Sequence, residues 1–221
     1  MGITAFDIKI LGKYIDLYKP KNVIELGSQN LYLTNENIPP FASKWYVDKG
    51  LKYQCIDLGG DNGAWKIDLA HQFGNDKKGG YPLEFDLVTD FGTSEHCVKM
   101  EHYDSLTYEN GVTSIYPKGE INIEEGYYNC WLNKHNLCKI GGLVISENPM
   151  TGMWNKHGYT FLGKDFYEEF VKISGYELLE DGVEGATGNW ITGVNVYGVI
   201  KKISDKFPDF ETFNTLSIYK S

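Results

Sequence analysis

The stretch KNVIELGSQN, residues 21–30, decides how this chain of 221 residues folds. Its apolar run predicts a short buried strand, and Gly27 ends that strand with a turn into small polar residues. A glycine at such a turn lets the backbone approach a ligand closely. The run also carries one carboxylate, Glu25, which is either a solvated strand-end residue or a residue that faces a positive charge or hydroxyl donors.

Strand and helix patterns alternate along the rest of the chain. Strands are expected at residues 22–26, 53–58, 64–69, 84–91 and 142–148, followed by a strand pair at 176–181 and 194–203. Helices are expected at residues 6–19, 39–52, 124–140 and 163–175, and another beginning near Thr93 or Ser94. This alternation predicts an α/β fold with a doubly wound, mostly parallel sheet, and the closing strand pair predicts one antiparallel strand.

Two segments interrupt this regular plan. We expect one domain spanning residues 1–221, with loop insertions at about 30–40 and 103–123. Both insertions follow strands and should lie over the carboxyl edge of the sheet, where loops carry function. They are therefore candidates for lids and pocket walls rather than separate domains.

The composition is that of an ordinary soluble globular protein, with 42% hydrophobic residues, 23% charged residues and a net charge of −9. All 21 basic residues are lysine. Arginine is the residue that usually binds phosphate and guanine through two hydrogen bonds. Its absence, together with the acidic net charge, argues against nucleic-acid binding. No apolar run is long enough to span a bilayer and no signal-peptide pattern opens the chain, so we expect a cytoplasmic protein with no membrane partner.

Acidic residues stand at the carboxyl ends of five expected strands, which is where ligands bind in sheets of this kind. They are Glu25, Asp57, Asp68, Asp90 and Glu147. Asp57 can accept hydrogen bonds from both hydroxyls of a ribose, and Asp68 can accept from an adenine amino group. A glycine turn, a ribose acid and an adenine acid together predict an adenosine-shaped site.

The order and spacing of these segments resemble those of the class I S-adenosylmethionine-dependent methyltransferases over nearly the whole chain. VIELGSQN resembles the first motif of that family, CIDLGGD its second-strand acid and WKIDLA its adenine-binding step. FDLVTDFGTSEHC resembles the fourth-strand motif, and LCKIGGLVISENP the helix, Gly-Gly turn and fifth strand that follow. The resemblance implies a seven-stranded sheet of order 3-2-1-4-5-7-6, with S-adenosylmethionine as the cofactor and S-adenosylhomocysteine as its product.

The resemblance also implies which residues bind the cofactor. Glu25 would act near the methionine amine through water or backbone, Asp57 would bind the ribose, and Asp68 would lie at the adenine. The full implied set is Glu25, Gly27, Ser28, Gln29, Asp57, Leu58, Asp68, Leu69, Asp90, Phe91, Gly92 and Glu95.

The first motif differs from the usual form of the family, because Ser28, Gln29 and Asn30 stand where further glycines are common. Gln29 and Asn30 can donate hydrogen bonds to the carboxylate of the cofactor. Two other functions stay open. A protein that keeps the cofactor-binding fold without chemistry would share this pattern, whereas a nicotinamide-dependent oxidoreductase would show a G-x-G-x-x-G turn, which this chain lacks.

The expected activity is methyl transfer to the oxygen or nitrogen of a small molecule, which needs alignment of the reacting atoms and a base. His157 and His96 are the candidates for that base, although His157 also suits a surface loop and His96 the support of a helix start. Trp154 and Tyr159 are candidates for a substrate wall. The aromatic stretch IYPKGEINI suits a homodimer contact.

No metal site is expected. Asp90 and Glu147 end neighbouring strands and form the one alternative, a Mg²⁺ pair, but the sequence offers them no third convergent acid. The four cysteines form no CxxC and no cluster with zinc spacing, which indicates reduced thiols.

Overall fold

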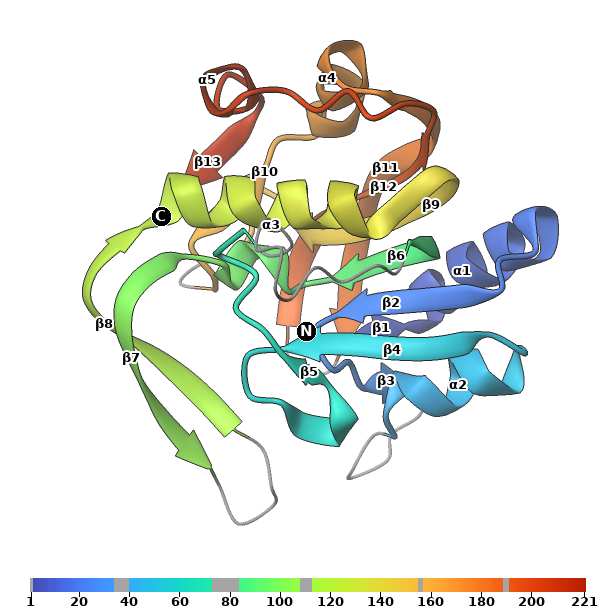
Figure 1. The fold of residues 1–221 in the computed structure, drawn as a ribbon, viewed down its shortest axis with the longest axis horizontal. Helices are drawn as coiled ribbons and strands as arrows, with labels where there is room; N and C mark the ends of the chain where they lie inside the picture. The colour runs from blue at the N-terminus through green and yellow to red at the C-terminus, as the bar shows by residue number, and fades with distance from the viewer. Residues whose placement is uncertain (1, 34–39, 73–83, 108–112, 155–156, 189–190) are drawn as a thin grey trace.

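The computed structural model describes residues 2–33, 40–72, 84–107, 113–154, 157–188 and 191–221 (Figure 1). Parts of both expected insertions, residues 34–39 and 108–112, lie outside the described residues. Among the described residues, no helix is both long and apolar enough to cross a membrane.

A mixed seven-stranded sheet forms the centre of the described chain, in the order β11-β12-β9-β6-β2-β4-β5. The strands are β2 (Asn22–Leu26), β4 (Lys52–Asp57), β5 (Trp65–Lys66), β6 (Phe85–Phe91), β9 (Cys138–Pro149), β11 (Tyr176–Gly188) and β12 (Ile191–Lys202). The pairs β4–β5, β2–β4, β2–β6 and β6–β9 are parallel, whereas β12 runs antiparallel to both β9 and β11. The expected α/β class and mixed sheet are confirmed.

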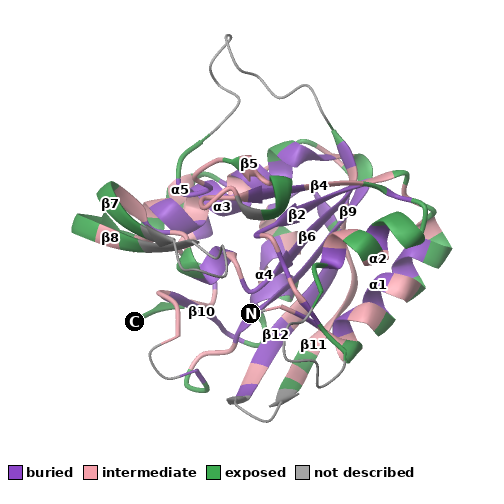
Figure 2. Cartoon of the chain, turned by 90° about the horizontal axis from the view of Figure 1, so that it is seen from below, coloured by how far each residue is buried: buried purple, intermediate pink, exposed green. Residues whose placement is uncertain are grey.

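Helices cover both faces of this sheet, because successive residues of a strand point to opposite sides. Val23 belongs to one core cluster, with α1 (Ala5–Tyr18) and α2 (Ala42–Asp48), while its neighbour Ile24 belongs to the other. That second cluster contains residues of α3 (Ile123–Leu137), α4 (Phe166–Ile173) and α5 (Phe210–Phe213). Figure 2 shows the central strands β2, β6 and β9 largely buried, whereas β11 at the sheet edge is mostly intermediate or exposed.

The first helix begins and ends at the signals that its sequence carries. Thr4 caps α1 by accepting a hydrogen bond from the backbone of Asp7, whose side chain accepts from the Thr4 backbone at 2.7 Å. The helix ends at Tyr18, and Lys19 takes a left-handed conformation just before Pro20. This boundary was predicted from Pro20 alone.

The prediction of a helix beginning near Thr93 or Ser94 was wrong about its length. Only one 3₁₀ turn, η2 (Ser94–His96), forms there, and Cys97 returns to extended backbone. Tertiary contacts explain the early end: Val98 is fully buried, and Gly126 of α3 lies so close to the Val98 backbone that a Cβ would collide with it. A continued helix would displace this contact.

The helix expected over residues 124–140 is also too long. It ends at Leu137, and β9 begins at Cys138, which pairs with Phe85 of β6. Burial of Cys138 in the core favours extended backbone there over another helical turn. The Gly141 turn, with its φ of +86°, therefore lies inside the strand segment instead of ending the helix.

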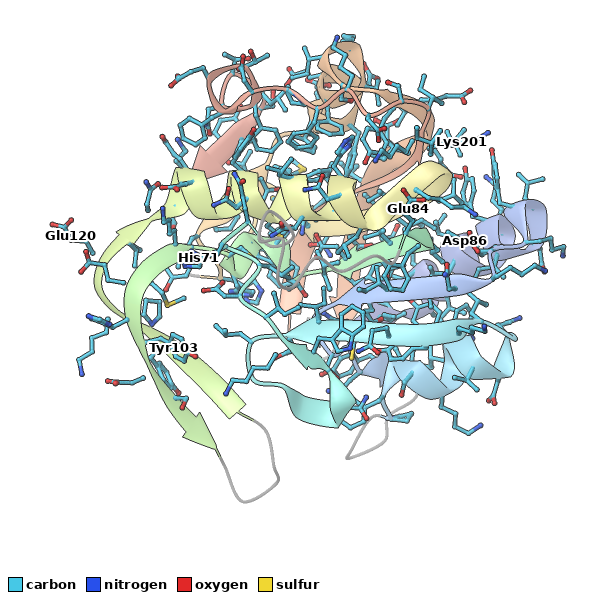
Figure 3. All side chains as sticks on the ribbon, in the orientation of Figure 1. His71, Glu84, Asp86, Tyr103, Glu120 and Lys201 are labelled. Carbon is cyan, nitrogen blue, oxygen red and sulfur yellow. The ribbon has the colours of Figure 1, made fainter. Side chains whose placement is uncertain are left out.

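The second expected loop insertion is a ribbon rather than a loop. Strands β7 (Lys99–Thr107) and β8 (Thr113–Asn122) pair antiparallel, and their Thr, Tyr and Ile content suits strands. Figure 1 shows this ribbon curving away from the central sheet. Tyr103 and Glu120, labelled in Figure 3, lie on it.

Two further strand pairs complete the described chain. β1 (Ile3–Thr4) runs parallel to β3 (Leu31–Tyr32), and β10 (Thr160–Leu162) runs antiparallel to β13 (Ile218–Lys220). The second pair ties the chain that follows β9 to the last strand of the protein.

Candidate functional site

A cavity of about 420 Å³ lies at the carboxyl ends of β2, β4, β5 and β6. Its wall comes from the loops after these strands, from η2 and from the β7–β8 ribbon, whose Met100 and Pro117 reach it. The ribbon insertion therefore supplies part of a pocket wall, as expected. The lining residues are Gly27, Ser28, Gln29, Ile56, Asp57, Leu58, Ile67, Asp68, Leu69, Gly92, Thr93, His96, Cys97, Val98, Met100, Pro117 and Tyr159.

Most of the residues singled out from the sequence meet at this cavity. Those that line it are Gly27, Ser28, Gln29, Asp57, Leu58, Asp68, Leu69, Gly92, His96 and Tyr159. Those that are not among its described lining are Glu25, Asp90, Phe91, Glu95, Trp154 and His157. The residues of this second group lie behind or beside the lining residues, and their contacts help to hold the cavity wall in place.

The turn after β2 depends on Gly27. Its φ is +76°, and the space where a Cβ would stand is taken by the side chains of Thr93 and Gln29. Gln29 is 5% exposed and donates to the Thr93 hydroxyl at 2.8 Å, and that hydroxyl donates to the Leu26 carbonyl at 2.8 Å. Glycine is required here by the packing of two side chains, and the amide of Gln29 already has protein partners.

Glu25 lies beneath this turn with no solvent exposure. Its Oε2 accepts hydrogen bonds from the Tyr53 hydroxyl at 2.7 Å and the Gln29 backbone at 3.2 Å. Burial raises the pKa of Glu25 to about 7, although these donors act against it. The strand-end carboxylate thus faces hydroxyl and amide donors that tie the turn to β4.

Ser28 and Asp57 both line the cavity. The Ser28 hydroxyl itself is buried and interacts with the Cys55 thiol. The Asp57 carboxylate accepts the backbone N–H of Ser28 at 3.1 Å and of Gly59 at 2.8 Å, one on each oxygen. Since a carboxylate has about four acceptor positions, Asp57 is held in place and keeps capacity for a ligand.

Asp68 is fixed in the same way after β5. Its Oδ1 accepts the backbone N–H of Ala70 at 2.9 Å, and the ring of His71 lies 3.6 Å from Oδ2. Leu69 beside it is buried and lines the cavity. Asp57 and Asp68 thus stand at successive strand ends on one cavity, as the sequence pattern predicted.

Asp90 is held in the protein interior by Lys134, which sequence reasoning did not single out. Nζ of Lys134 lies 2.5 Å from Oδ2 of Asp90, and both side chains are 1% exposed or less. Oδ1 accepts the backbone N–H groups of Thr93 and Ser94 at 3.0 and 3.2 Å. Burial raises the pKa of Asp90, but Lys134 outweighs it and holds the pKa below its usual value. A lysine among the buried positions of a helix is the sequence signal for such a pair.

The pair of Asp90 and Glu147 does not form a Mg²⁺ site. Asp90 is opposite Ser146 in the β6–β9 register, and Ser146 donates to its carboxylate at 3.1 Å. Glu147 is the next residue of β9, so it points to the other face of the sheet, where it accepts from Asn195. Burial, with the nearby Asp7, raises the pKa of Glu147 well above its usual value.

Glu95, His96 and His157 gather beside the cavity. Oε1 of Glu95 lies 3.5 Å from Nε2 of His96 and 3.7 Å from Nε2 of His157. Burial lowers the pKa of His96 below its usual value. Trp154 lies behind this group, with its ring 5.2 Å from that of His157 and its Nε1 donating to the Val194 carbonyl at 2.8 Å.

Comparison with solved structures shows the class I S-adenosylmethionine-dependent methyltransferase fold. The 1,6-didemethyltoxoflavin N1-methyltransferase of Burkholderia thailandensis, solved with S-adenosylhomocysteine, matches with a TM-score of 0.51 at 8% identity, over 87% of this chain and 76% of that one. The N-methyltransferase NodS of Bradyrhizobium japonicum, also solved with S-adenosylhomocysteine, matches with a TM-score of 0.50 at 10% identity, over 91% and 89%. No family model and no curated protein matches the sequence. The chain therefore has this fold.

Proposed function

We propose that the protein binds S-adenosylmethionine in the 420 Å³ cavity and transfers its methyl group to an oxygen or nitrogen of a small molecule. One observation carries the proposal: the Asp57 and Asp68 carboxylates and the Gly27 turn line one cavity at the carboxyl edge of the sheet. The volume is within the range of small-ligand pockets, about 300–1,000 Å³. The two solved structures named above both hold S-adenosylhomocysteine, which supports the same cofactor here.

The lining residues suit the parts of the cofactor. Asp57 would accept hydrogen bonds from the ribose hydroxyls, because it keeps free acceptor positions next to the glycine turn. Asp68 would accept from the adenine amino group, with Leu69 against the ring. The backbone of the Gly27 turn would approach the methionine end of the cofactor closely.

The cofactor supplies an activated methyl group on a sulfonium, so the protein has to align the acceptor and remove its proton. Gly92 and Thr93 give the wall on the β6 side of the cavity, and His96 and Tyr159 give the wall beside it. The prediction that His157 or His96 takes the proton stays a prediction. Both rings lie next to the fully buried Glu95 carboxylate.

The acceptor is expected to be small and not polyanionic. The chain carries a net charge of −9 and all its basic residues are lysine, which disfavours nucleic acids as substrates. Tyr159 offers an aromatic surface at the cavity, whereas the Trp154 ring is 7% exposed and supports His157 from behind. Trp154 is thus placed to fix the loop that carries His157.

Transfer of a labelled methyl group tests this function. The full chain would be incubated with S-adenosylmethionine labelled in the methyl group and with pools of small hydroxyl and amine compounds, and labelled products separated by chromatography. We expect label in at least one pool and, at limiting cofactor, much less of it with Asp57→Ala, while Asp48→Ala, an exposed aspartate of α2, keeps the activity. Cofactor binding without transfer to any pool would favour the non-catalytic alternative.

A further inference from the structure

Two buried polar atoms beside the cavity lack hydrogen-bond partners. Oε1 of Glu95 and Nε2 of His157 are both inaccessible to solvent and unpaired among the described residues. The whole Glu95 side chain is 0% exposed. Because an unpaired buried carboxylate oxygen costs several kcal/mol, its persistence needs an explanation, and a bound ion is one.

The distances between these atoms are closer to those between the ligands of one metal ion than to those of hydrogen bonds. Oε1 of Glu95 lies 3.5 Å from Nε2 of His96 and 3.7 Å from Nε2 of His157, both too long for hydrogen bonds. Ligand atoms of all three residues lie within 4.8 Å of one another. Two ligands each about 2.1 Å from a tetrahedral Zn²⁺ are about 3.4 Å apart, which is close to the observed separations.

The backbone brings the three residues together from two loops. The Tyr159 N–H donates to the Glu95 carbonyl at 2.8 Å, which joins the loop after β9 to η2. Gly158 has a φ of +75°, and a Cβ there would stand 2.8 Å from Cγ of Glu95. Asn148 donates to the other oxygen of Glu95, Oε2, at 3.3 Å, so Oε1 is the oxygen left for a ligand.

We propose that Glu95, His96 and His157 bind a divalent transition-metal ion of the Zn²⁺ type through Oε1 and the two Nε2 atoms. One carboxylate and two imidazoles are a common donor set for such ions, and three protein ligands leave at least one coordination position open. Of the three residues, His96 lines the cavity, which puts the proposed site next to the place of the acceptor. The site then selects an acceptor with an oxygen donor, an inference that rests on the proposed function.

An ion held by these residues would lower the pKa of a bound acceptor hydroxyl, whose proton would be lost to solvent. The acceptor oxygen would then attack the methyl carbon as the bond from that carbon to sulfur breaks, and the electron pair of that bond would stay on sulfur in S-adenosylhomocysteine. A histidine whose Nε2 binds the ion has no lone pair left there to act as the base. The metal role and the base role of His157 are therefore alternatives that experiment separates.

Metal binding by the purified full chain, stripped with a chelator, tests the site directly. We expect calorimetric titration with Zn²⁺ to show one ion per chain, and Co²⁺ to give visible absorption bands of low-symmetry coordination. Glu95→Gln and His157→Ala should each weaken Zn²⁺ binding by more than about tenfold. His102→Ala, an exposed histidine on the ribbon, is the matched control and should bind like the wild type.

Thermal melts of all variants show whether each one is folded, and His157→Ala, in a loop, provides a second test if Glu95→Gln is not. Absence of Zn²⁺ binding in the wild type, or equal binding by the folded variants, would overturn the proposal. S-adenosylhomocysteine titrated into the same samples separates the two ideas. Cofactor binding without Zn²⁺ binding refutes only the metal site, and Zn²⁺ binding without cofactor binding refutes only the proposed function.

Discussion

Replacement of Lys134 by methionine tests the buried ion pair that supports the cavity wall. The ammonium group lies 2.5 Å from the Asp90 carboxylate, and the same carboxylate accepts the Thr93 and Ser94 N–H groups that begin η2. Nζ also lies 3.8 Å from the centre of the Trp131 ring. Methionine keeps an apolar stem against that ring but leaves Asp90 buried without its counter-charge.

The cost follows from the burial of both partners. Removing one member of a buried ion pair costs about 3–5 kcal/mol, since the other charge stays desolvated. In a chain of this size each kcal/mol lowers Tm by about 2–4 °C, so Lys134→Met should lose about 6–20 °C. The double variant Asp90→Asn/Lys134→Met removes both charges and should recover part of that loss.

Thermal unfolding followed by circular dichroism near neutral pH measures these differences. Lys139→Met is the matched control, because Lys139 is 42% exposed and pairs with Asp86. Asp86, labelled in Figure 3, lies at the opposite end of β6 from Asp90. Exposed pairs contribute about 0–1 kcal/mol. A loss in Lys134→Met no larger than that of Lys139→Met would refute the reasoning.

The same pair gives a pH dependence of known sign. The folded pKa of Asp90 is below its usual value, so its contribution to stability is present above the unfolded pKa and is lost as pH falls through the folded one. Between neutral pH and about pH 3, the wild type should therefore lose more stability than the double variant.

The turn after β2 and its acids carry the other predictions. The pKa of Glu25 is raised to about 7, so between about pH 4.5 and 7 the folded protein keeps a proton that the unfolded chain has lost. The free energy of unfolding should therefore fall as pH rises through this range. Glu25→Gln should remove up to about 3 kcal/mol of this pH dependence, as measured by urea unfolding. Gly27→Ala should cost about 1–3 kcal/mol because of its φ and its two side-chain neighbours, whereas Gly12→Ala, with open space on α1, should be neutral or stabilising. Asp57→Ala should weaken S-adenosylhomocysteine binding by more than about tenfold in calorimetry, and unchanged affinity would reject its ribose role.

The regular part of the fold could be predicted because local signals agreed with tertiary packing. Pro20 ends α1, and the apolar run before Gly27 forms β2. The local signals failed where contacts between residues far apart in the sequence determined the backbone conformation. Thr93 and Ser94 suggested a helix start, but the close approach of Gly126 to Val98 allows one turn only.

The candidate site divides in the same way. Asp57 and Asp68 follow strands, so their place on the carboxyl edge was readable from spacing. Lys134 meets Asp90 from 44 positions away, and the His157 loop meets Glu95 across the sheet edge, so the pattern along the chain did not reveal either contact. Sequence reasoning thus found the cavity but not the interactions that hold its wall.

Calorimetric titration of the purified chain with S-adenosylhomocysteine, with NAD as the comparison ligand, tests the central claim most directly. The Asp57 and Asp68 carboxylates on one cavity predict micromolar binding of S-adenosylhomocysteine at one site per chain, and no binding of NAD. Binding of NAD in preference to S-adenosylhomocysteine, or of neither, would contradict the proposed methyltransferase function.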